Sequence, residues 1–264
     1  MKVRIIWGAI AAAIFIPLLV IGNLPFQLFA GLLAMLGVSE MLRMKRLEVF
    51  SFEGILAMLA AFVLTVPMTN YLSFLPIDAN FACYGFIVFL ILAGTVFNSE
   101  RYSFEDAAFP IAASLYVGIG FQNLVNARLV GVDKVLFALF IVWATDMGAY
   151  FVGRKIGKRK LLPQVSPNKT IEGSLGGIAS AVVVALVFML IDHSVYAPHA
   201  LLTMLLFVML FSLFAQFGDL VESAIKRHFA VKDSGKLIPG HGGILDRFDS
   251  IIFVFPLMHL IGLF

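Results

Sequence analysis

The stretch IEGSLGGIASAVVVALVFMLI, residues 171–191, carries one charged side chain, Glu172, and otherwise consists of small and apolar residues. About 17 to 25 residues of this kind, coiled as a helix, cross the hydrocarbon core of a bilayer. The whole chain shares this composition: of its 264 residues, 61% are hydrophobic and 13% are charged, and the mean hydropathy is +0.99. Such values exclude an ordinary soluble domain and predict an integral membrane protein.

Apolar segments of this length recur along the chain, which predicts an all-α integral membrane protein with about nine transmembrane helices. The expected spans are residues 5–21, 24–42, 54–72, 80–97, 107–126, 134–152, 171–191, 200–217 and 248–264. The sequence contains no internal repeat or flexible linker between them. We therefore expect a single polytopic membrane domain, residues 1–264.

The positions of lysine and arginine give the expected orientation, because cytoplasmic loops of membrane proteins are enriched in both. With a cytoplasmic N-terminus, every Lys and Arg except Arg128 and Lys134 falls in an inner segment. Nine spans then leave the C-terminus outside. The two longest inner segments, residues 153–170 and 218–247, are basic, so we expect the active site to face the cytoplasm from the cell (inner) membrane. A formal net charge of +3 is too small to indicate a nucleic-acid partner.

A polar stripe continues the eighth span. Its residues stand at i, i+3, i+4, i+7 and i+8, which share one side of a helix: Asp219, Glu222, Ser223, Lys226 and Arg227. A solvated face joined by ion pairs is the ordinary interpretation of such a stripe. Asp219, however, follows the apolar run 201–214, where an ionised acid is costly and indicates a partner.

Two more acids open the ninth span, after a turn-rich loop. The loop residues that let backbone N–H groups approach a ligand closely are Gly235, Pro239, Gly240, Gly242 and Gly243. Asp246, Asp249 and Ser250 then follow at i, i+3 and i+4. A single acid here fits a helix cap or a partner for the helix dipole. Two acids facing a second acid-bearing helix across the turn favour a site for a hard cation.

Magnesium takes oxygen ligands, usually one or two carboxylates completed by substrate phosphates and water. The basic residues of the same segment would neutralise a polyphosphate: Lys226, Arg227, Lys232 and Arg247. Acids for a metal and bases for phosphates in one cytoplasmic segment favour phosphoryl or nucleotidyl transfer. The residues alone leave the substrates open.

The segment SAIKRHFAVKDSGKLIPGHGGILDRFD, residues 223–249, resembles the signature of the CDP-diacylglycerol synthases, also called phosphatidate cytidylyltransferases. The fixed positions of that signature match at Ser223, Lys226, Arg227, Lys232, Asp233, His241, Gly242, Gly243, Asp246, Arg247 and Asp249. WATDMGAYFVGR, from Trp143, and SPNKTIEGSLGG, from Ser166, also resemble family segments. The resemblance thus covers a catalytic half, residues 131–264, whereas residues 1–130 are N-terminal spans without an assigned role.

The resemblance implies that CTP and phosphatidate react to CDP-diacylglycerol and pyrophosphate, a step of phospholipid biosynthesis that requires Mg²⁺. It also implies a polytopic helical fold and a homodimer, and it leaves the number of cations open. The implied metal ligands are Asp219, Asp246 and Asp249. The implied catalytic residues are Asp219, Lys226, Arg227, Asp246, Arg247 and Asp249. The implied substrate-binding residues are Ser166, Asn168, Lys169, Ser223, Lys232, His241, Gly242 and Gly243.

Two further features of the sequence each allow two interpretations. Asp146 lies within the sixth span, where an ionisable group either contacts substrate or metal or pairs with a lysine such as Lys169. The run Ser166 to Thr170 precedes the seventh span, where Ser, Thr and Pro either start a helix or present N–H groups and a lysine to a phosphate. The basic cluster 153–160 lacks P-loop spacing, and we interpret it mainly as a topology signal.

Two other functions compete with this interpretation. An ion-coupled transporter would show half-broken helices and symmetric repeats, and the sequence offers neither. A polyprenol or dolichol kinase would use CTP but transfer its terminal phosphate. The identity of the lipid product separates the kinase from a cytidylyltransferase.

Overall fold

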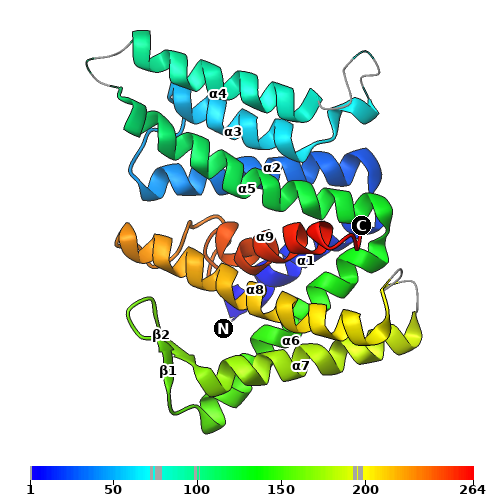
Figure 1. Ribbon diagram of the computed structural model, residues 1–264. Coiled ribbons are helices and arrows are strands. Elements are labelled where there is room, and N and C mark those ends of the chain that lie inside the picture. Colours follow the sequence, from blue (N-terminus) through cyan, green and yellow to red (C-terminus); the bar gives the residue numbers. More distant parts are fainter. Residues whose placement is uncertain are drawn as a thin grey trace. The chain divides into compact units, whose positions relative to one another are not determined.

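The computed structural model describes residues 2–71, 74, 79–97, 100, 102–192, 195 and 199–264. Within them the regular secondary structure is helical apart from one short hairpin (Figure 1). Its elements are α1 (Lys2–Ile21), α2 (Asn23–Met44), α3 (Phe52–Thr65), the 3₁₀ turn η1 (Met68–Asn70), α4 (Ala79–Phe97), α5 (Phe104–Val130), α6 (Val132–Ile156), β1 (Lys160–Leu162), β2 (Ser166–Thr170), α7 (Ile171–Ile191), α8 (Leu201–His228) and α9 (Leu245–Leu260).

Six of these helices, α2 and α4 to α8, are long and apolar enough to cross a membrane. They indicate a multi-pass membrane protein. The all-α class is confirmed, and each of the nine predicted segments contains an α-helix. The number of membrane crossings, and the side of the membrane on which each terminus lies, stay predictions.

The third predicted span, residues 54–72, is wrong at its C-terminal end, because α3 stops at Thr65. Val66 is extended and precedes Pro67, and the residue before a proline disfavours the helical conformation. Asn80 satisfies the backbone groups freed there: its amide nitrogen donates to the Val63 carbonyl (2.6 Å) and its oxygen accepts from Met68 N (3.1 Å). The predicted end at residue 72 lies outside the described residues.

The chain divides into two compact units, Met1–Leu129 with Val231–Arg247 and Val130–Ala230 with Phe248–Phe264. In the first unit, α3 packs between α2 and α4 (Figure 1). Ala60 and Leu64 of α3 form a buried cluster with Tyr84 of α4. Arg128, one of the two predicted outer cations, donates from Nη2 to the Val20 carbonyl (2.9 Å), so a positive charge meets the C-terminal end of α1.

In the second unit, α6 and α7 pack along each other, and the hairpin β1–β2 joins them (Figure 1). Glycine permits the close approach. A Cβ atom on Gly177 would lie 2.8 Å from the Thr145 carbonyl of α6, and small residues are the usual means by which membrane helices approach this closely. Helix α8 joins the pair through the buried hydroxyls of Thr145 and Ser212, which lie 2.9 Å apart.

The α6–α7 contact gives a test of this packing. Gly177→Ala should destabilise the protein by about 1 to 3 kcal/mol, because its methyl group overlaps the Thr145 carbonyl. Gly85→Ala in α4 is the matched control, since nothing lies within 4 Å of its added Cβ. Its better helix propensity should raise stability by about 0.5 to 1 kcal/mol. Thermal unfolding in detergent measures both, and shifts in the same direction would contradict the close approach.

Candidate active site

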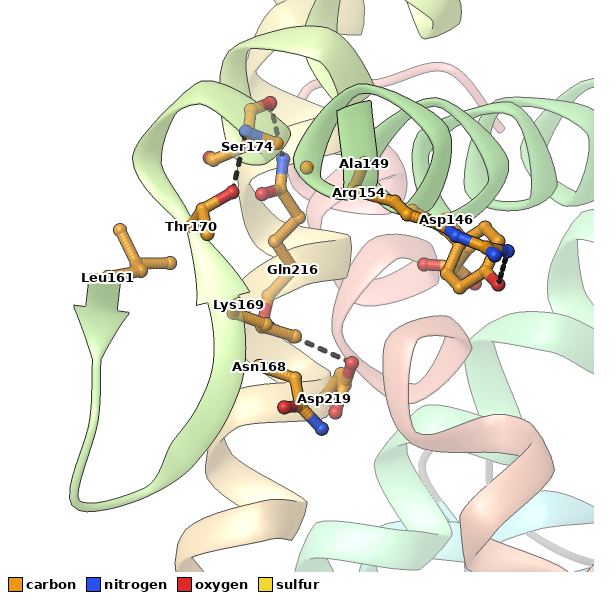
Figure 2. A pocket seen from close by; sticks show the side chains of 13 residues that line it. Asp146, Ala149, Arg154, Leu161, Asn168, Lys169, Thr170, Ser174, Gln216 and Asp219 are labelled. Carbon is orange, nitrogen blue, oxygen red and sulfur yellow. Dashed lines mark hydrogen bonds and ion pairs between the residues drawn. The ribbon is translucent and has the colours of Figure 1, made fainter. Parts of the chain in front are cut away.

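A cavity of about 510 Å³ lies in the second unit and is bordered by α6, the hairpin, α7 and α8 (Figure 2). We call it the hairpin pocket. Its lining residues are Asp146, Ala149, Tyr150, Gly153, Arg154, Leu161, Asn168, Lys169, Thr170, Gly173, Ser174, Gln216 and Asp219. Three predicted functional residues, Asn168, Lys169 and Asp219, therefore meet in one cavity, together with the candidate Asp146.

Asp219 forms the ion pair that is expected for an acid next to an apolar run. Lys169 Nζ lies 2.6 Å from Asp219 Oδ2 (Figure 2), and these side chains are 24% and 35% exposed. Ser223, one helical turn along α8, donates to Asp219 Oδ1 at 3.2 Å. Lys169 thus pairs with Asp219, and the carboxylate is held at the pocket wall from two sides.

The hairpin positions Lys169. Thr170 ends β2 and caps α7, since its hydroxyl accepts from Gly173 N at 3.1 Å. Glu172 then accepts from the backbone N–H groups of Lys158 (3.0 Å) and Arg159 (3.2 Å), which fastens the start of the hairpin to the same helix. The expected helix start is confirmed at Thr170 only. Ser166 and Asn168 do not start the helix. They lie in strand β2, which pairs antiparallel with β1 before the chain enters α7.

Asp249 belongs to the acidic group of the second unit. Helices α8 and α9 approach closely at Gly218, where an added Cβ atom would lie 3.1 Å from Ser250 Cα. The side chain of Asp249 is near enough to Asp219 and Asp146 for charge repulsion, and near enough to Lys226 for attraction. Three carboxylates and a lysine therefore share one electrostatic environment.

The polar stripe of α8 differs from a solvated face. Glu222 is 1% exposed, and its Oε2 lies 2.6 Å from Lys226 Nζ one turn along the helix. Arg227, in contrast, is exposed in the last turn. The ion pair expected on such a stripe is present but buried, so the solvated interpretation is wrong for Glu222.

The predicted glycine-rich loop lies in the first unit and folds into a tight turn. His241 N donates to the Ile238 carbonyl (2.9 Å), and Gly240 and Gly242 have φ angles of 81° and 87°, a region that favours glycine. A cavity of about 690 Å³ opens on this turn, and we call it the loop pocket. The side chains that line it include the predicted binding residues Lys232 and His241, the predicted catalytic residue Arg247, and also Lys236 and Asp233. This cationic lining suits phosphate oxygens.

Asp246 is fixed by donors of the same loop. Its Oδ2 accepts hydrogen bonds from Ser234 N (2.8 Å), Ser234 Oγ (2.9 Å) and Gly243 N (2.8 Å). The glycine at 243 is required, because an added Cβ would collide with Ser234 and with Glu40 of α2. The loop therefore sets the direction of a predicted metal ligand.

Sequence reasoning missed Arg154 and Gln216, which line the hairpin pocket, and Ser234 and Glu40, which are hydrogen-bonded to each other beside Asp246. Glu40 carried a usable signal, since an ionisable group inside the predicted span 24–42 indicates function by default. Arg154 was assigned to the topology cluster, although its side chain borders the hairpin pocket. Gln216 and Ser234 are ordinary polar residues whose partners are distant in sequence.

The acids offer the oxygen ligands that Mg²⁺ prefers. In the described part of the chain, no three His, Cys, Asp or Glu side chains form a ready metal-holding group. Mg²⁺ commonly completes its shell with substrate phosphates and water, so these carboxylates fit a cation that binds together with a nucleotide. Asp219 and Asp249 belong to the second unit and Asp246 to the first. That all three carboxylates bind one cation stays a prediction.

Comparisons with known proteins agree with the chemistry of these residues. A model of the cytidylyltransferase family matches residues 2–264. A phosphatidate cytidylyltransferase of Staphylococcus saprophyticus is 43% identical over 264 residues, covering 99% of this chain and 98% of the relative. That of Bacillus subtilis is 41% identical over 270 residues, covering 100% and 98%. The chain belongs to the cytidylyltransferase family.

Proposed function

We propose that this protein is a phosphatidate cytidylyltransferase, which converts CTP and phosphatidate to CDP-diacylglycerol and pyrophosphate in phospholipid biosynthesis. The observation that carries the proposal is its near full-length similarity to enzymes of that name. The hairpin pocket supports it, because Lys169 and Asp219 supply the charges that phosphate and metal chemistry require. The helices long enough to cross a membrane suit a lipid substrate.

The reaction is a displacement at phosphorus. A phosphate oxygen of phosphatidate attacks the α-phosphorus of CTP, a new O–P bond forms, and the bond to the oxygen bridging toward the β-phosphorus breaks. Pyrophosphate leaves with that electron pair. Positioning and neutralisation of spreading negative charge supply most of the catalysis in such transfers. The attacking oxygen is already ionised near neutral pH, so His241 is not required as a base.

The basic side chains bind and orient the two phosphate-bearing substrates. Lys169 meets phosphate oxygens at the hairpin pocket, and Lys232 and Arg247 do so at the loop pocket. Ser166, Asn168, Ser223, Gly242 and Gly243 are proposed to line the substrates. Lys226 and Arg227 add positive charge at the end of α8.

Asp219, Asp246 and Asp249 are the proposed Mg²⁺ ligands. When bound, Mg²⁺ would supply Lewis-acid neutralisation of the phosphate oxygens. The chain's own residues prepare for it: Lys169 and Ser223 hold Asp219, and Ser234 and Gly243 hold Asp246. Carboxylates oriented in advance lose little freedom when a cation arrives. The number of cations is left open.

The membrane setting follows from the substrates. Phosphatidate keeps its acyl chains in the lipid, whereas CTP arrives from water, so the site needs access to both. We place the site and the N-terminus on the cytoplasmic face of the cell membrane, on the distribution of Lys and Arg, with the C-terminus outside. A homodimer and a catalytic half at residues 131–264 are part of the same proposal.

Labelled CTP tests the reaction directly. With purified protein, phosphatidate and Mg²⁺, label at the α-phosphate of CTP should move into the lipid fraction, and label at the γ-phosphate should leave as pyrophosphate. The reason is that the bond between the α- and β-phosphates breaks. Lipid that gains the γ label and not the α label would show a CTP-dependent kinase, and the proposal would be wrong.

Loss of either key acid should abolish turnover. Asp219→Asn and Asp246→Asn should each lower kcat about a hundredfold or more, because an amide neither carries the charge nor binds a hard cation as well. Glu105→Gln, at an exposed acid in the first turn of α5, is the control and should keep full activity. Thermal unfolding checks folding. Full activity in either Asn variant, or activity after thorough chelation, contradicts the metal role.

Lys169 should matter chiefly for CTP. Lys169→Met keeps an unbranched side chain but removes the charge, so KM for CTP should rise about tenfold, equivalent to about 1.4 kcal/mol. Lys158→Met removes the same charge from an exposed position of the same basic segment and serves as the control. Steady-state kinetics at varied CTP measure both. Equal changes in the two variants would indicate general charge loss and not a contact at Lys169.

A further inference from the structure

Glu40, near the C-terminal end of α2, is a deeply buried carboxylate with 3% exposure. Burial of an ionised carboxylate is costly unless hydrogen bonds compensate. Its Oε1 accepts from Ile244 N at 2.8 Å, and its Oε2 accepts from Leu245 N at 3.0 Å. Ser234 Oγ lies 2.9 Å from the same Oε2. All these residues belong to the first unit.

These contacts place Glu40 at the beginning of α9. Backbone N–H groups at a helix N-terminus lack acceptors within the helix, and a negative charge there is favourable. Glu40 supplies both, from 204 and 205 residues away in the sequence. It therefore caps the helix whose first turn carries Asp246.

Ser234 joins Glu40 to Asp246. Its hydroxyl oxygen lies 2.9 Å from Glu40 Oε2 and 2.9 Å from Asp246 Oδ2, and its backbone N donates to Asp246 Oδ2 at 2.8 Å. A hydroxyl has one hydrogen to donate, so it bonds one of the two carboxylates at a time while its oxygen stays in contact with both. Glycine at 243 makes room for this contact, because a Cβ there would meet Glu40 and Ser234.

We propose that Glu40 is a positioning residue for Asp246, acting through Ser234 and through the first turn of α9. This inference rests on the proposed function, in which Asp246 binds Mg²⁺. It gives a role in the reaction to a residue of the N-terminal spans. Partners of this kind behind a metal ligand typically change metal affinity about 10- to 100-fold when they are lost.

The chemistry of the carboxylate suggests the variants. Glu40→Gln keeps the length but has one oxygen, so its NH₂ group must face either the Ile244 N–H or the Leu245 N–H, which are both donors. Ser234→Ala keeps both backbone bonds of Glu40 and removes the hydroxyl contacts to Glu40 Oε2, Asp246 Oδ2 and Asp246 N. Ser39→Ala is the control, because the neighbouring Ser39 hydroxyl donates to the Leu36 carbonyl within α2.

Two measurements are made on purified full-length protein in detergent. The first is the Mg²⁺ concentration that gives half of the maximal rate at saturating CTP and phosphatidate. The second is independent of turnover: thermal unfolding at saturating CTP, titrated with MgCl₂. We expect Glu40→Gln and Ser234→Ala each to raise the half-saturating Mg²⁺ concentration about tenfold in both measurements. The double variant should rise by less than the product of the single effects. Ser39→Ala should match the wild type.

A merely structural Glu40 gives another result: a lower unfolding temperature in the variants, with the wild-type half-saturating Mg²⁺ concentration. That result, or single effects that multiply in the double variant, would overturn the inference. If Glu40→Gln fails to fold, Glu40→Asp replaces it: its shorter side chain keeps the charge but cannot reach Ser234 Oγ and both backbone N–H groups together, while Ser234 and its own bonds to Asp246 stay unchanged. Wild-type protein that makes no CDP-diacylglycerol refutes the proposed function itself, whereas an active, Mg²⁺-dependent wild type with unaffected variants refutes only the role of Glu40.

Discussion

An ionised side chain in so apolar a chain is stable only with specific partners, and this requirement organises both units of the protein. Asp219 is held by Lys169 and Ser223 at the hairpin pocket. In the other unit, Glu40 and Asp246 share Ser234 and the N–H groups of the glycine-rich loop. The loop, the hairpin and the first turn of α9 each supply donors that a carboxylate needs.

The same arrangement explains how a protein with little covalent chemistry can catalyse nucleotidyl transfer. Such catalysis depends on charges fixed before the substrates arrive, so that no reorganisation is needed during the reaction. A carboxylate bound by N–H and O–H donors keeps its direction, whereas one on a mobile surface does not. The lysines and arginines that border both pockets then oppose the charge of the phosphates. The glycines of the loop are consistent with this function, because they let backbone donors reach Asp246.

Hydropathy was sufficient to predict the helices, since each expected segment contains one. Hydropathy does not register the effect of Pro67, which ends α3 at Thr65, before the predicted end of that span. The hairpin was missed because two short, partly exposed strands have no apolar periodicity. Helical spacing correctly placed Asp219 and Ser223 together. The partners Lys169 and Ser234 lie 50 and 194 residues from Asp219 and Glu40, respectively, and hydrogen bonds across such separations leave no local pattern. An acid inside an apolar span, such as Glu40, was the one remaining signal.

The most direct test is the binding of radiolabelled CTP to purified protein by equilibrium dialysis, with and without Mg²⁺. Because coupling between two ligands is reciprocal, a cation held jointly by carboxylate and nucleotide must strengthen CTP binding. We expect Mg²⁺ to tighten CTP binding to the wild type and to lose most of this effect in Asp219→Asn. Equal CTP affinity of the wild type with and without Mg²⁺, or an undiminished Mg²⁺ effect in Asp219→Asn, would contradict a cation bridging Asp219 and CTP.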